Sequence, residues 1–123
     1  MPVRSLSSAV FKWPDRESVL RAARAWARSL RQHDSTVRSI HCVGSCARGD
    51  WGVGSDLDVI VIIDDTDMSL VERRRRYEPT DVPVPADVFV YTASEWDALA
   101  LRSPHLFRRL ERERVDLLAD PPS

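Results

Sequence analysis

The sequence VGSCARGDWGVGSDLDVIVII, residues 43–63, decides the fold of this chain. Its last seven residues, Leu57–Ile63, are apolar on both faces and rich in Val and Ile, which predicts a central strand covered on both sides. Its first half predicts a turn at Gly44, a short helical turn over Ser45–Asp50 and a loop with two glycines over Trp51–Ser55.

The residues on either side continue an alternation of helices and strands. Upstream, apolar residues recur at helical spacing between Trp13 and His33, and Val37–Val43 predicts a strand with Val37, Ser39, His41 and Val43 on one face. Downstream, the pattern predicts five elements: a helix over Ser69–Tyr77, a strand over Asp87–Tyr91, helices over Ser94–Leu101 and Pro104–Arg114, and a short strand over Val115–Leu118. This order predicts an α+β fold in which a mixed β-sheet packs against helices.

The length and composition fit a single domain over residues 1–123, with a frayed tail over Asp120–Ser123. No stretch approaches the roughly 18 apolar residues that a membrane span needs. Met1–Lys12 lacks the apolar core of a signal peptide, so we expect a cytoplasmic protein. The net charge of −1 gives no basic field that would draw the protein to nucleic acid.

Two carboxylates mark the start of the buried strand. Asp56 and Asp58 are two residues apart, so on a strand they point to the same face about 7 Å apart, at roughly 3.3 Å per residue. Taken alone, an Asp-x-Asp pair can simply cap a turn and face water. Asp87 begins another strand, and three acids at one end of two core strands favour a site for Mg²⁺, which prefers oxygen ligands.

The Gly44-Ser45 pair follows a predicted strand and opens a short helical turn. Glycine allows a phosphate to approach the backbone closely, and the first amides of a helix point toward an anion. Ser45 can add a hydroxyl donor. Most Gly-Ser pairs after strands are plain turns, so this pair indicates phosphate binding only in combination with the acids.

That combination resembles the signature of the DNA polymerase beta-like nucleotidyltransferase superfamily. The matching strings are Val43-Gly44-Ser45-Cys46-Ala47-Arg48-Gly49 and Gly54-Ser55-Asp56-Leu57-Asp58-Val59-Ile60-Val61, followed by Ala86-Asp87-Val88-Phe89. They look most like the minimal nucleotidyltransferases, the antitoxins paired with HEPN-domain toxins. The resemblance implies the nucleotidyltransferase fold.

The resemblance also implies a reaction: transfer of AMP from ATP to an acceptor hydroxyl. In this interpretation Asp56, Asp58 and Asp87 are catalytic and hold two Mg²⁺ ions, with Asp87 nearest the acceptor. Gly44 and Ser45 would bind the β- and γ-phosphates. Arg48 would supply positive charge to the leaving pyrophosphate, unless it is an ordinary surface arginine.

The acceptor is the open part of this interpretation. Small relatives lack the added domain that grips an acceptor, so the acceptor would be another macromolecule, or a second subunit would complete the cleft. The leading hypothesis is an adenylyltransferase antitoxin that modifies a HEPN-type toxin. One alternative is a non-catalytic antitoxin that neutralises its partner by contact, and another is transfer to a small molecule.

Three further patterns carry structural expectations. Arg73–Arg76 predicts a solvated helix, with contact to an acidic partner or RNA as the alternative. Trp51 is expected in the core, with lining of the nucleotide cleft as the alternative. Leu106, Phe107 and Leu110 share a helical face that predicts core packing.

Overall fold

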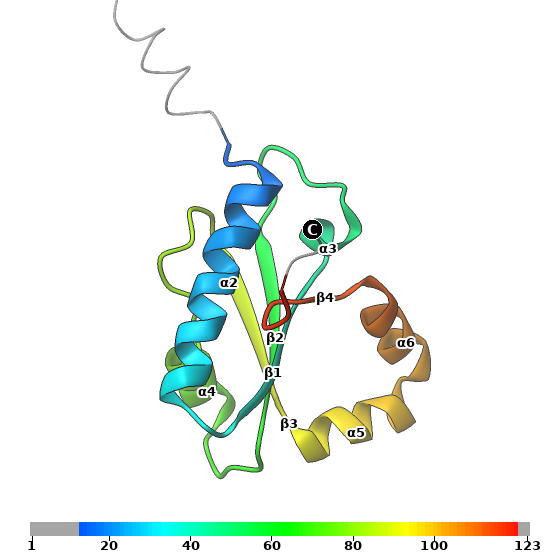
Figure 1. Cartoon of the computed structure of the whole chain (residues 1–123). Helices are drawn as coiled ribbons and strands as arrows, with labels where there is room; N and C mark the ends of the chain where they lie inside the picture. Colours follow the sequence, from blue (N-terminus) through cyan, green and yellow to red (C-terminus); the bar gives the residue numbers. More distant parts are fainter. Residues whose placement is uncertain (1–12, 121–123) are drawn as a thin grey trace, which may run out of the picture.

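The structure of the chain is a computed structural model that describes residues 13–120 (Figure 1). Its elements are, in order, α2 (Arg16–His33), β1 (Val37–Val43), α3 (Ser45–Arg48), β2 (Leu57–Ile63), α4 (Leu70–Arg76), β3 (Ala86–Thr92), α5 (Ala93–Arg102), α6 (Pro104–Glu113) and β4 (Val115–Asp116). The strands form one sheet in the order β3-β2-β1-β4. Strand β2 is antiparallel to β1 and parallel to β3, and β4 pairs antiparallel with β1. The predicted α+β fold with a mixed sheet is confirmed.

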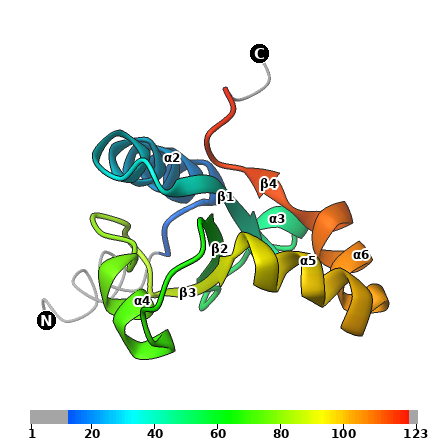
Figure 2. The same ribbon diagram turned by 90° about the horizontal axis from the view of Figure 1, so that it is seen from below.

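Helices cover both faces of the sheet. Helices α2 and α4 lie on one face, whereas α5 and α6 lie on the other, as the view from below shows (Figure 2). Strand β2 runs through the middle, and six of its seven residues are buried. Its apolar pattern on both faces therefore reflects helices on both sides, as the sequence predicts.

The larger core lies under α2. Asp15 caps this helix by accepting a hydrogen bond from the backbone N of Ser18 at 2.8 Å. Along one side of the helix, Val19, Leu20, Ala23, Trp26 and Ala27 are buried against the sheet. Burial of this stripe accounts for much of the helix's stability, because packing outweighs intrinsic propensity in most protein helices.

The smaller core, on the opposite face, joins Val43, Ile60 and Ile62 to partly buried side chains from β3, α5 and α6. The predicted core packing of Leu106, Phe107 and Leu110 is confirmed for Leu110, which packs partly buried against this core, and is wrong for Leu106, which is 36% exposed. Helix α6 packs on α5, with the rings of Trp96 and Phe107 5.1 Å apart, and contacts the sheet through Leu110.

Strand β1 departs from the regular alternation predicted for it. Its register against β2 shifts between Val37 and Ser39, which marks a bulge. Val37 consequently lies with Ile40 and Cys42 in the larger core, not on the face of Val43.

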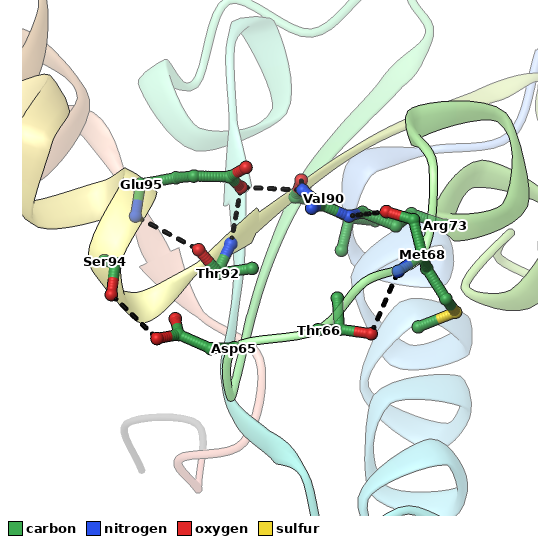
Figure 3. Close-up of polar contacts among 8 residues, drawn as sticks. All are labelled: Asp65, Thr66, Met68, Arg73, Val90, Thr92, Ser94 and Glu95. Carbon is green, nitrogen blue, oxygen red and sulfur yellow. Dashed lines mark hydrogen bonds and ion pairs between the residues drawn. The ribbon is translucent and has the colours of Figure 1, made fainter.

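Arg73 is buried, so the prediction of a fully solvated arginine run is wrong at its first residue. Its guanidinium is hydrogen-bonded to Glu95 Oε1 at 2.6 Å and to the carbonyl of Met68 at 3.1 Å (Figure 3). The same carboxylate oxygen of Glu95 accepts from the backbone N of Thr92. This pair ties α4 and α5 to the end of β3, and a buried arginine is tolerated because its donors are satisfied.

A second buried charge, Asp34, ends α2. One carboxylate oxygen accepts from the backbone N and hydroxyl of Thr36, and the other accepts from Arg76 and, at 2.8 Å, from the Tyr77 hydroxyl. Burial alone raises the pKa of Asp34, but these hydrogen bonds outweigh burial and hold its pKa below the ordinary value.

None of the helices within residues 13–120 is long and apolar enough to cross a bilayer. The expectations for Met1–Lys12 and for a frayed end at 121–123 lie outside the described residues. Asp120, the first residue of the predicted tail, forms an exposed ion pair with Arg28.

Asp34→Asn is predicted to lower the free energy of unfolding by about 2 kcal/mol at pH 7, because it removes the charge that three side chains solvate. The folded-state pKa is depressed, so this stabilisation is fully present above the unfolded pKa of about 3.9 and is lost as pH falls through the folded pKa. Urea unfolding from pH 7 to pH 3 measures both effects.

Asp120→Asn is the control, because its carboxylate is 97% exposed and its ion pair is worth little. Equal losses of stability in the two variants would contradict the role given to Asp34.

Candidate functional site

The turn between β1 and α3 is built around Gly44. Its φ of +75° and ψ of −150° belong to a region that residues with a Cβ rarely adopt. A Cβ on Gly44 would lie 2.8 Å from Oδ2 of Asp58, closer than a real Cβ comes to any atom. Glycine at this position therefore lets the backbone of the turn pack directly against a carboxylate.

The sheet brings two of the three predicted acids together. Asp58 is the register partner of Val43 on one side and of Asp87 on the other, so both acids stand at the same end of adjacent strands. Asp58 is half-buried, whereas Asp87 is exposed. Asp56 precedes β2 by one residue and is also exposed.

The acids do not form a ready-made metal site. Among residues 13–120, no three Asp, Glu, His or Cys side chains are arranged so that they could hold an ion as they stand. The exposed side chains of Asp56 and Asp87 would have to turn toward Asp58 to share a cation with it.

The electrostatics of Asp58 nevertheless suit a cation. Burial raises the pKa of Asp58, and the negative charges of Asp87 and Asp56 raise it further, while Arg48 lowers it. A divalent cation would remove the repulsion between these carboxylates and replace the lost solvation of Asp58. The donors are all carboxylate oxygens, which Mg²⁺ prefers, so the residues present fit this ion.

A pocket of about 430 Å³ opens beside Asp58, within the size range of small-molecule sites. The residues that line it come from β1, α3, β2, β3 and α6: Val43, Gly44, Arg48, Asp58, Phe89, Arg109, Leu110 and Glu113. Three residues predicted for the site are among them, whereas Ser45, Asp56 and Asp87 lie outside the lining.

Arg48 closes α3 and faces this pocket. Its guanidinium is 3.2 Å from Asp50 and 3.8 Å from Glu113, and its side chain is 44% exposed. The contact with Glu113 links α3 to α6 across the pocket, so Arg48 is more than an isolated surface arginine.

The other five lining residues were not predicted as part of the site: Val43, Phe89, Arg109, Leu110 and Glu113. Phe89 is 48% exposed, which is unusual for an aromatic residue inside a strand and follows from its place two residues after Asp87 on the same face. The α6 residues could not be found from local pattern, since only the tertiary fold brings that helix to the strand ends.

Trp51 does not line the cleft, so that alternative is wrong. Its indole N–H donates to the carbonyl of Pro14 at 2.9 Å, and its ring packs against the larger core. Trp13 likewise donates to the carbonyl of Ser55. Together the two tryptophans fasten the loop before Asp56 to the start of α2.

Gly44→Ala is predicted to lower the free energy of unfolding by more than about 2 kcal/mol, because backbone strain adds to the collision with Asp58. In an Asp58→Ala background the same change should be less costly, since the collision is gone. Urea unfolding of the four proteins in this double-mutant cycle measures the coupling. Additive costs would show that Gly44 and Asp58 are not in close contact.

The model of the nucleotidyltransferase domain family matches residues 24–116 of the chain. Two solved structures are similar in fold. One is an inferred nucleotidyltransferase from Sulfolobus solfataricus, with a TM-score of 0.59 and 19% identity over 85% of this chain and 88% of that one. The other is a toxin–antitoxin structure with AMP-PNP, with a TM-score of 0.52 and 19% identity over 79% of this chain and 73% of that one.

A comparison with curated protein sequences gave no significant match. The family match spans the Gly44 turn and all three acids, and the fold agrees with that of the solved structures. The chain therefore belongs to the nucleotidyltransferase domain family.

Proposed function

We propose that this protein is a Mg²⁺-dependent adenylyltransferase that transfers AMP from ATP to a hydroxyl of a partner protein, and that the partner is a HEPN-type toxin. One observation carries the catalytic part of the proposal. The Gly44 turn, which could hold phosphates, lies directly against Asp58, which is in register with Asp87.

Each group of residues at the site would have a separate role in the reaction. Asp58 and Asp56, with Asp87, would hold Mg²⁺, which supplies charge neutralisation for the triphosphate and for the attacking oxygen. Gly44 and Ser45 would bind phosphate through backbone and hydroxyl donors. Arg48 would stabilise the negative charge that develops on pyrophosphate as it leaves.

The surface beside Asp87 favours a macromolecular acceptor. An apolar groove of about 270 Å³ runs along β3 and α4, and its lining includes Leu70, Val88 and Phe89. Leu70 is 68% exposed and Phe89 48%. Arg74, which also lines the groove, reaches within 3.9 Å of Asp87. Exposed apolar residues next to a candidate catalytic acid are typical of a protein-binding surface.

The similarity in fold to a toxin–antitoxin structure supports the proposal that the partner is a toxin. That structure contains AMP-PNP, an ATP analogue, and shares the fold of this chain. A role as antitoxin, with ATP as the nucleotide, is consistent with both facts.

The test is a transfer assay with labelled ATP, Mg²⁺ and the protein encoded next to this gene. The double variant Asp56→Asn/Asp58→Asn should lower labelling of the partner by more than about 100-fold, since loss of even an outer partner of a metal ligand costs up to that factor. The fold should persist, because Asp56 is exposed and Asp58 half-buried.

Asp65→Asn/Asp67→Asn is the matched control. It removes two acids with the same spacing from the opposite end of β2 and should leave labelling unchanged. Full labelling by the Asp56→Asn/Asp58→Asn protein would refute the catalytic assignment. A stable complex without labelling by the unmodified protein would favour a non-catalytic antitoxin.

A further inference from the structure

Helix α6 forms one wall of the pocket beside Asp58. It contributes Arg109, Leu110 and Glu113, which face the pocket together with Gly44 of the turn. Arg109 and Glu113 are four residues apart and so lie on the same side of the helix. The pocket thus has the carboxylate of Asp58 on the strand side, and both the guanidinium of Arg109 and the carboxylate of Glu113 on the helix side.

The arginines on and near the pocket wall differ in whether their guanidinium groups already have a partner. Arg48 is within ion-pair distance of Asp50 and Glu113. Within α6, Arg108 contacts His105. Arg109 is exposed, and its guanidinium has no hydrogen bond or ion pair with any residue in 13–120.

An anionic ligand at Gly44 would meet the negative charge of Asp58 on one side of the pocket. The positive charge of Arg48 is already shared between two carboxylates. Arg109 is the guanidinium left to bind phosphate oxygens, for which its fork of donors is well suited. The pocket is also large enough for a nucleotide-sized ligand.

We propose that Arg109, from α6, binds a phosphate group of a nucleoside triphosphate in the pocket that Gly44 and Asp58 line. This inference rests on the proposed function, because it takes a nucleoside triphosphate as the ligand. It assigns the helix a direct part in binding substrate, beyond its packing on α5 and on the smaller core.

Calorimetric binding of ATP and of inorganic tripolyphosphate to the full chain, each with Mg²⁺, tests this. Arg109→Ala should weaken the binding of both ligands by about tenfold or more, as expected for loss of a charge-assisted hydrogen bond. The loss should be shared by the two ligands because both carry the phosphates. Unchanged thermal unfolding of the variant will show that it is folded.

Arg112→Ala is the control, since Arg112 is an exposed arginine on the same helix that does not line the pocket. It removes the same charge and should leave both affinities unchanged. An equal loss in Arg112→Ala, or a loss for ATP without one for tripolyphosphate, would overturn the inference.

The binding experiment gives different results if only the inference is wrong and if the proposed function is wrong as well. If the unmodified protein binds ATP and Arg109→Ala binds it equally well, only the role of Arg109 is wrong. If the unmodified protein does not bind ATP with Mg²⁺, the proposed function and this inference are both wrong.

Discussion

The site depends on the close contact between Gly44 and the carboxylate of Asp58, across adjacent strands. The turn at Gly44 can follow β1 only because no Cβ is present, and Asp58 occupies the space that a Cβ would take. The register that pairs Val43 with Asp58 also pairs Asp58 with Asp87. The positions of the turn, both acids and the pocket are therefore set by one stretch of sheet.

This arrangement places negative charge at the end of a buried strand, which is unfavourable without compensation. The surrounding residues neutralise only part of this negative charge. Arg48 lies near Asp58 but is shared with Asp50 and Glu113, and Arg74 lies 3.9 Å from Asp87. At Asp34 and Arg73, by contrast, several hydrogen bonds compensate the buried charge. The incomplete compensation at Asp58 supports the cation site that we propose there.

Much of the fold could be predicted because the strong signals are local. The strands at 37–43 and 57–63 have the predicted bounds, since hydrophobic runs between turn residues define them. The sequence also indicated that Asp87 begins a strand, but only the sheet shows that β3 lies next to β2.

The predictions that failed concern residues whose positions depend on tertiary contacts. Arg73 looks like its three arginine neighbours and is buried only because Glu95, 22 residues later, meets it. The position of α6 likewise depends on how α5 and α6 turn back toward the sheet, so Arg109 and Glu113 gave no local signal. Trp51 lies in the loop between Ser45 and Asp56, yet its hydrogen bond to Pro14 directs its ring to the larger core and not to the pocket beside Asp58.

The central claim is that Asp58 and Asp87 share a cation beside phosphates bound at Gly44. A crystal structure with Mn²⁺ and a non-hydrolysable ATP analogue tests it most directly, because Mn²⁺ scatters anomalously. The account predicts an anomalous peak within bonding distance of the Asp58 carboxylate, with phosphate oxygens next to Gly44. Nucleotide bound elsewhere on the protein, or a metal peak away from Asp58, would contradict it.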